Sequence, residues 1–231
     1  MPLYQGKGIV LRSLEFGESD RLVTFLSRDW GKIKAICKNA RKVKSGFLAS
    51  LTPLNYVEIV FFGREGRSLF RLNACEIVNP FSRLRSDLET FFAALYLIDI
   101  VEALSPEGEA NEPVFQLLLE VLNLLPGYKN PGPLLRFFEI RFLDYLGYRF
   151  ETEKCLHCRN TCKPRETRFN PTGSGLVCAA CSRRGKEAIA ISASTLNFIK
   201  MGLQLPVDRS LRLKLNPTPQ KELEHILHLC L

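Results

Sequence analysis

The chain has 231 residues, of which 46% are hydrophobic and 24% are charged. These proportions allow a real hydrophobic core and argue against a disordered chain. No stretch approaches 18 consecutive apolar residues, and the N-terminal segment lacks the basic and apolar regions of a signal peptide, so we expect a cytoplasmic protein without a membrane span.

The net charge of +8 is unevenly distributed along the chain. Residues 1–80 contain 13 Lys and Arg against 7 Asp and Glu, giving +6, and residues 151–231 contain the same numbers. Residues 81–150 contain 6 basic and 10 acidic residues, giving −4. This segregation favours a polyanion bound by the two basic ends, with a merely basic surface as the alternative.

The first eighty residues alternate β-type segments with turns that contain glycine. Strands are predicted at residues 7–16, 21–27, 33–38, 54–62 and 69–78. Five strands in so short a segment predict a closed or half-closed barrel, because an open sheet would leave its edges exposed. We therefore expect an α+β protein whose domain 1–80 is a five-stranded OB-fold.

After residue 80 the apolar residues recur at helical spacing. Helices are predicted at residues 81–104, 114–125 and 134–146, and the third is apolar on more than one face. They define a helical domain, 81–150. Two shorter helices, 192–203 and 220–229, lie in a C-terminal segment, 187–231, that we expect to pack on the helical domain.

Five of the eight cysteines lie between Cys155 and Cys181. In a reducing compartment this clustering indicates metal rather than disulfides. Cys155 and Cys158, and again Cys178 and Cys181, have the spacing by which two knuckles hold one Zn²⁺ with four thiolates. The turn residues at 169–175 can bring the second knuckle back to the first. The segment 151–186 is therefore predicted to be a zinc ribbon with one structural ion.

Two further residues lie close enough to replace a ligand. Cys162 has three residues between it and Cys158, a poorer knuckle spacing, and we interpret it as a spare thiol. His157 lies inside the first knuckle and is expected to be exposed.

The sequence offers no catalytic motif. None of the three histidines fits a zinc hydrolase or deaminase pattern, and the phosphate-binding loop of nucleotide hydrolases and the nucleophile elbow are absent. His225 and His228 lie three residues apart, which is more typical of a solvated helix face than of a metal site. We therefore expect a protein that is not an enzyme.

The densest basic run follows Trp30 and spans the third predicted strand and the loop after it. It consists of Lys32, Lys34, Lys38, Arg41, Lys42 and Lys44. In a regular strand the even-numbered lysines share the outer face while Ile33 and Cys37 point inward. Cations that follow phosphates beside an aromatic that stacks on bases are how OB-folds bind single strands, so these residues and Trp30 are the candidate DNA-binding set. Alternatively, the cations only solvate a loop and Trp30 caps the barrel.

Several segments together resemble the bacterial DNA repair protein RecO family. They are GIVLR at residues 8–12, KNARK at 38–42 with Ser45, RFFEIRFL at 136–143 leading to LGY at 146–148, and the two cysteine pairs. The resemblance extends from residue 1 to about residue 200. It maps the family's basic DNA-binding stretch onto Lys38, Arg41, Lys42 and Lys44.

The resemblance implies an OB-fold, a helical domain and a zinc ribbon in a recombination mediator. It implies binding of single- and double-stranded DNA, annealing of complementary strands, contact with the C-terminal tail of the single-strand-binding protein SSB, and a complex with RecR that helps load RecA, with RecF involved indirectly. A nucleoid-associated protein is expected. The tail after Leu203 departs from the family pattern.

Two expectations concern protein partners. The acidic middle repels phosphate, so it is the expected surface for proteins, and the candidate cations for the SSB tail are Arg83, Arg85, Arg136 and Arg141. The alternative function is a protein-interaction or RNA-associated module whose basic surface is incidental.

Overall fold

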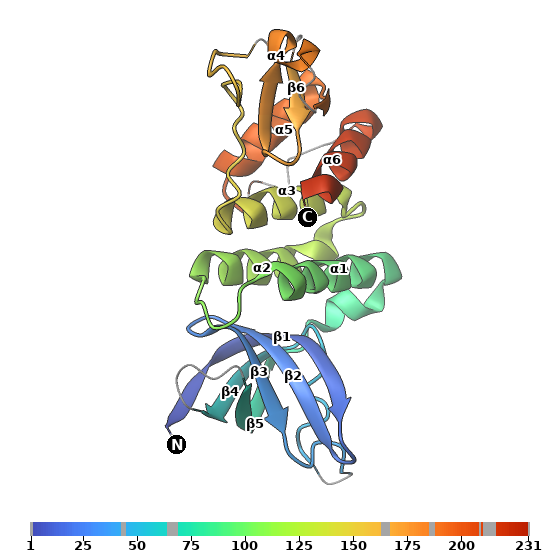
Figure 1. Cartoon of the computed structure of the whole chain (residues 1–231). Helices are drawn as coiled ribbons and strands as arrows, with labels where there is room; N and C mark the ends of the chain where they lie inside the picture. Colours follow the sequence, from blue (N-terminus) through green and yellow to red (C-terminus); the bar gives the residue numbers. More distant parts are fainter. Residues whose placement is uncertain are drawn as a thin grey trace. The chain divides into compact units, whose positions relative to one another are not determined.

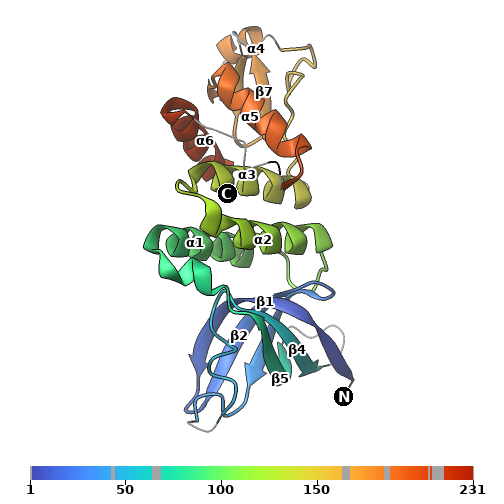
Figure 2. The same cartoon turned by 180° about the vertical axis from the view of Figure 1, so that it is seen from behind.

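The computed structural model describes residues 2–42, 45–63, 69–162, 167–184, 188–207, 209 and 216–230. The chain divides into two compact units, Met1–Gly127 and Tyr128–Leu231. Figures 1 and 2 show the elements of both units from opposite sides. Among the described residues, no helix combines the length and the apolar character that crossing a membrane requires.

The first unit begins with a closed barrel of five strands (Figure 1). They are β1 (Leu3–Phe16), β2 (Asp20–Ser27), β3 (Gly31–Cys37), β4 (Tyr56–Phe62) and β5 (Leu69–Asn79). The strand order is β1-β2-β3-β5-β4, and β4 pairs back with β1 to close the barrel. The β3–β5 pair is parallel and the others are antiparallel. The predicted OB-fold barrel is thus confirmed.

The barrel interior is filled by alternate residues of its strands. On β3 these are Ile33, Ala35 and Cys37, and on β2 they include Val23 and Phe25. The expected inward orientation of Ile33 and Cys37 is confirmed, because side chains of a strand alternate between its two faces. The even-numbered residues of β3 consequently lie on the outer face.

Helical segments complete the first unit beside the barrel (Figures 1 and 2). They are η1 (Ser82–Ser86), α1 (Leu88–Leu104), α2 (Glu112–Leu124) and η2 (Leu125–Gly127). The single helix expected at 81–104 is broken at Asp87, whose backbone is extended and whose carboxylate accepts a hydrogen bond from the N–H of Thr90. The apolar spacing runs through this N-cap, which is why the sequence did not reveal the break.

The turn before β3 touches the connection between α1 and α2. Gly31 has a left-handed φ of 64°, and a Cβ built on it would lie 2.0 Å from the carbonyl oxygen of Glu109. Next to it, the N–H of Gly108 donates to the carbonyl of Lys32. Only glycine permits this close approach, so residue 31 fixes how the connection lies on the barrel.

The second unit contains three longer helices and a small sheet. The helices are α3 (Gly132–Tyr145), α5 (Ala193–Gln204) and α6 (Pro217–Cys230). α3 packs against both α5 and α6. Within this unit, a helix from residues 81–150 thus contacts both C-terminal helices.

The small sheet belongs to the segment that contains Cys155, Cys158, Cys178 and Cys181, here called the cysteine module. It comprises β6 (Thr167–Asn170), β7 (Gly175–Cys178) and β8 (Ile189–Ala190) in the order β7-β6-β8, with the short helix α4 (Ala179–Arg183) after β7. β6 and β7 form a hairpin whose turn, residues 171–174, is the one expected to return the second knuckle.

The expected division into four domains treated residues 81–150 as one domain. In the structure these residues are shared: α1 and α2 belong to the unit of the barrel, whereas α3 belongs to the unit of the cysteine module. The physical reason is packing, since α1 contacts β1 of the barrel while α3 contacts α5 and α6.

Candidate metal centre and nucleic-acid interface

Four cysteine sulfurs meet in the cysteine module. The Sγ atoms of Cys155, Cys158, Cys178 and Cys181 all lie within 4.8 Å of one another. Those of Cys158 and Cys178 are 3.7 Å apart, and Zn–S bonds of ~2.3 Å in a tetrahedron place sulfurs roughly 3.8 Å apart. The predicted knuckles therefore form a four-thiolate cluster that fits one tetrahedral ion.

The surroundings of the cluster favour the thiolate at Cys155 and the neutral thiol at Cys181. Burial of Cys155 raises the pKa of its thiol, but backbone N–H groups of Cys158, Cys178 and His157 outweigh this and lower the pKa to about 6. The N–H of Cys178 lies 3.4 Å from the Cys155 sulfur. For Cys181, burial and the neighbouring thiols raise the pKa to about 12. A cation at the centre would lower the pKa of the Cys181 thiol, because cysteine ligands bind a metal ion as thiolates.

Cys162 and His157 lie outside the four-sulfur group. Cys162 packs beside the cluster, and burial together with the nearby thiols raises its pKa to about 11. The side chain of His157 is exposed, as expected. His225 and His228 are exposed on α6, which agrees with a solvated helix face. Four ligands close a tetrahedral shell, so the cluster leaves no position for a catalytic water.

The loop after β3, residues 38–42, carries three exposed cations: Lys38, Arg41 and Lys42. Ala40 at its centre is buried in the barrel core and anchors the loop. The hydroxyl of Ser45 donates to the carbonyl of Ala40, and the N–H of Ser45 donates to that of Lys42. Lys44 lies outside the described residues. We refer to residues 38–42 as the basic loop.

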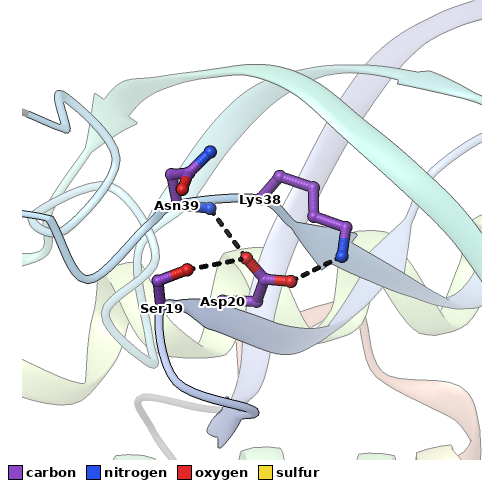
Figure 3. A network of polar contacts seen from close by, with 4 residues as sticks. All are labelled: Ser19, Asp20, Lys38 and Asn39. Atoms are coloured by element: carbon purple, nitrogen blue, oxygen red, sulfur yellow. Dashed lines mark hydrogen bonds and ion pairs between the residues drawn. The ribbon is translucent and has the colours of Figure 1, made fainter.

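The turn between β1 and β2 fastens the basic loop in place (Figure 3). The Asp20 carboxylate accepts from the Lys38 ammonium at 2.6 Å, from the N–H of Asn39 at 2.9 Å and from the Ser19 hydroxyl at 3.4 Å. Asn39 has a left-handed φ of 56°, which its Asp20 contact helps to hold. The hydrogen bonds from Lys38 and Asn39 lower the pKa of Asp20, so the group is a carboxylate at neutral pH.

Arg41 makes a second set of contacts with the same turn. Its backbone N–H donates to the carbonyl of Ser19 at 3.0 Å, and its guanidinium lies 3.2 Å from a carboxylate oxygen of Glu15 and 3.3 Å from the carbonyl of Glu18. Figure 1 shows this turn at the end of the barrel farther from α1 and α2. The cations thus project from a constrained surface and not from a free tail.

Lys32 and Lys34 are placed differently from the basic loop. They lie on the outer face of β3 as predicted, but this part of the face is covered by the α1–α2 connection. Lys32 is buried and donates to the carbonyl of Glu102 at 2.6 Å, and Lys34 is ion-paired with Glu107. The strand pattern could not show that the outer face would be covered, so their expected exposure is corrected.

Trp30 lies at the opposite end of β3 from Lys38. Eight residues at ~3.3 Å each separate the two by roughly 25 Å along an extended strand. Its ring packs on Tyr4 with centroids 4.7 Å apart and on Phe61 with centroids 6.2 Å apart, and it is partly buried against the core. The geometry matches the alternative interpretation, in which Trp30 caps the barrel.

Sequence reasoning missed an aromatic residue beside the basic loop. Phe16 ends β1 opposite Asp20, and its side chain is 45% exposed. The available signal was its position: a phenylalanine directly before the turn Gly17-Glu18-Ser19, where a core residue is unexpected.

Of the four candidate arginines for a protein tail, three have partners within the chain. Arg85 donates to the carbonyl of Pro53, Arg136 pairs with Glu139, and Arg141 donates to the carbonyl of Leu203. Arg83 is exposed and lines a hollow of about 300 Å³ whose walls are mixed, with the polar Asn79, Ser82 and Asn123 beside apolar residues such as Phe81 and Leu122. It is therefore the one of these four arginines that lies exposed beside a hollow with some apolar walls.

These features define the class of protein: an OB-fold barrel with an exposed basic loop, joined to helices and a four-cysteine metal-binding module. The family model for the N-terminal part of recombination protein O matches residues 1–81, and the model for its C-terminal part matches residues 85–231. The chain belongs to the RecO family of DNA repair proteins.

Individual relatives agree over nearly the whole chain. The DNA repair protein RecO of Pelotomaculum thermopropionicum is 36% identical, over 94% of this chain and 83% of its own length. That of Symbiobacterium thermophilum is 33% identical, over 98% and 90%. That of Alkaliphilus metalliredigens is 32% identical, over 97% and 91%.

Proposed function

We propose that this chain is a non-enzymatic recombination mediator that binds single- and double-stranded DNA and anneals complementary strands. The observation that supports this most directly is the constrained basic loop, from which Lys38, Arg41 and Lys42 project. Because the loop is already ordered, neutralising phosphates there requires little further loss of conformational entropy. Lys44, outside the described residues, is included from the sequence alone.

In this proposal Lys32 and Lys34 hold the α1–α2 connection against the barrel and do not contact phosphate. Trp30 likewise supports the barrel end. The DNA-contacting set is therefore smaller than the strand pattern suggested, and it lies at one end of the barrel.

Annealing needs a second place for a strand, because two strands repel each other through their phosphates. The cysteine module offers one. Arg168 and Arg183 are exposed there and line a hollow of about 620 Å³ with Thr167 and Ser182. Among the residues that the structure describes, neither arginine has a carboxylate within 4.0 Å. We propose that this surface receives the second strand.

We further propose that the four-cysteine cluster binds one Zn²⁺ whose role is structural. Four thiolates are the ligand set of structural zinc sites, and a closed shell leaves the ion no substrate position. The ion would hold together a module whose own hydrophobic cluster is small, centred on Cys155, Val177 and Cys181.

The proposed partners are RecR, which would act with this protein to load RecA, the C-terminal tail of SSB, and RecF indirectly, in the cytoplasm and associated with the nucleoid. For an acidic, hydrophobic tail we propose the hollow beside Arg83, where the guanidinium would meet a carboxylate. If Arg83→Ala binds an SSB-tail peptide as well as the unmodified protein does, the tail site lies elsewhere.

The decisive experiment measures annealing of SSB-coated complementary oligonucleotides. A variant with Lys38, Arg41 and Lys42 replaced by Ala should lose annealing and bind all DNA more weakly. Its log K against log salt on single strands should flatten by up to about two units, since each phosphate contact contributes ~0.7. The matched control replaces Lys7, Lys129 and Lys221, which are exposed elsewhere.

The same salt titration distinguishes the proposed function from the alternative one. A protein-interaction or RNA-associated module with an incidental basic surface would show equal losses in the loop variant and in the charge-matched control. Docking through apolar surfaces would also change little with ionic strength, whereas phosphate binding weakens steeply.

A further inference from the structure

An exposed aromatic side chain stands in a row with two charged residues across three strands of the barrel. Phe16 on β1 is the cross-strand partner of Asp20 on β2. Asp20 in turn precedes Arg21, which pairs with Cys37 on β3, so that Lys38 continues the row and its ammonium reaches the Asp20 carboxylate at 2.6 Å. The ring and the cation therefore share one face of the barrel, roughly 10 Å apart at ~4.8 Å per strand.

That face is the outer one. Its next row contains Leu14, Leu22 and Ile36, while the alternating positions Val23 and Ala35 fill the core. Leu14 is 43% exposed and Phe16 is 45% exposed. No ring contact of Phe16 occurs within the described part of the chain. The barrel end thus presents an unstacked phenyl ring beside the basic loop.

We propose that Phe16 is the residue of this barrel on which an unpaired base stacks, while Lys38 and Arg41 neutralise the flanking phosphates. The inference rests on the proposed binding of DNA by the basic loop. A flat apolar ring beside fixed cations matches an unpaired nucleotide, which offers a π-face and a phosphate together. A base inside a duplex is already stacked on both sides, so the contact serves single strands and gives the barrel a preference for them.

Asp20 belongs to the same arrangement as a positioning residue. It binds both the Lys38 ammonium and the Asn39 N–H (Figure 3). These contacts hold the cation in place relative to the strand that carries the Phe16 ring. The phosphate and the base of a bound nucleotide are covalently linked, so a fixed separation of cation and ring favours simultaneous contact.

The test compares Phe16→Ala and Phe16→Trp in the full-length protein, with an oligothymidine single strand and a hairpin duplex as probes across a salt series. Phe16→Ala should weaken single-strand binding about 5- to 150-fold, the range of one stacked base, with an unchanged salt slope. Duplex affinity should change less than about twofold on the same grounds. Phe16→Trp should bind the single strand at least as tightly as the unmodified protein.

The matched control is Phe92→Ala, which removes an exposed ring on α1, away from the basic loop. A second probe is an oligonucleotide of abasic sites: with no base to stack, the unmodified protein and Phe16→Ala should bind it equally. Equal single-strand affinity of Phe16→Ala and the unmodified protein, or equal losses in Phe16→Ala and Phe92→Ala, overturns the inference.

The outcomes also separate this inference from the function on which it rests. If the loop variant lacking Lys38, Arg41 and Lys42 binds DNA normally, the proposed DNA surface itself is wrong. If that variant loses affinity while Phe16→Ala does not, the DNA surface stands and only the stacking contact is refuted.

Discussion

A single carboxylate organises the basic loop. Asp20 receives a side-chain cation, a backbone N–H and a hydroxyl, and its side chain is only 15% exposed although it lies at a turn. The backbone contact is the structurally demanding one, because it holds Asn39 in a left-handed conformation. A carboxylate therefore determines where the side chains that we propose to bind phosphate lie.

Two substitutions at Asp20 separate its two roles. Asp20→Asn retains an oxygen for the Asn39 N–H but loses the ion pair with Lys38, so the loop should remain ordered. Asp20→Ala removes both contacts, and the loop should loosen. Hydrogen exchange at the Asn39 amide measures this: we expect faster exchange in Asp20→Ala and near-normal exchange in Asp20→Asn. Equal protection in all three proteins would mean that the loop is held by other contacts.

The same group predicts a dependence on pH. Hydrogen bonds from Lys38 and Asn39 lower the pKa of Asp20 in the folded protein from its ordinary value near 3.8. A depressed pKa means that the stabilising contacts are fully present above pH 4 and are lost as the pH falls through the folded value. Loop order should therefore be constant from pH 5 to neutrality and decline below 4, which the Asn39 amide resonance would report.

At the scale of elements, β3 separates two groups of residues that adjoin in the sequence. Its seven residues, Gly31–Cys37, carry the chain from one end of the barrel to the other. The Lys32 side chain consequently donates to the last turn of α1 and Lys34 pairs with the α1–α2 connection, whereas Lys38 meets the β1–β2 turn. The basic run therefore divides into two groups of residues. Lys32 and Lys34 take part in internal packing, and the basic loop forms an exposed surface.

The β1–β2 turn also limits the charge of the basic loop. Glu15 lies 3.2 Å from the Arg41 guanidinium and is well exposed, so a DNA phosphate at the proposed surface would have to compete with it. Glu15→Gln should bind DNA more tightly at low salt by ~1.5- to 5-fold, the value of an exposed ion pair, and the advantage should shrink as salt rises. Glu120→Gln, an exposed site on α2, is the control with the same charge change. Matching gains in both variants would assign the effect to net charge alone.

The fold was largely predictable because its signals are local. Alternation identified the five strands and placed Ile33 and Cys37 in the core, and the spacing of Cys155, Cys158, Cys178 and Cys181 identified the cluster. What could not be predicted depends on tertiary contact. Tertiary contacts between elements determine that Lys32 is covered, that Trp30 packs on aromatic residues and that Phe16 is exposed. The periodicity of the sequence does not show which elements will meet.

At the scale of the whole molecule, the basic and acidic segments form ion pairs with each other. Glu107 and Glu112 of the acidic middle pair with Lys34 and Arg28 of the barrel. Part of the opposite charge thus serves to join the helices of the first unit to its barrel. The basic loop and the arginines of the cysteine module retain exposed cations, and these are the surfaces proposed for DNA.

We expect the cysteine module to depend on the zinc ion that we propose for it. Cys178→Ser removes one of four ligands and should lower bound zinc from one equivalent per chain to near zero, unfolding the module, because a structural ion contributes directly to folding. Cys162→Ser should keep a full equivalent, since its sulfur lies outside the four-sulfur group. Zinc content by elemental analysis decides this. A full equivalent retained by a Cys155→Ser/Cys178→Ser double variant would contradict the ligand assignment.

Because of the close contact at Gly31, we expect substitution of this residue to produce a temperature-sensitive protein. A methyl group there would be forced against the carbonyl of Glu109, in a residue that is already left-handed. The damage would fall on the junction of barrel and helices, while the basic loop at the far end of β3 would keep its chemistry. A bacterium carrying Gly31→Ala in this gene should therefore repair DNA at low growth temperature and fail at high temperature, because the weakened junction melts first.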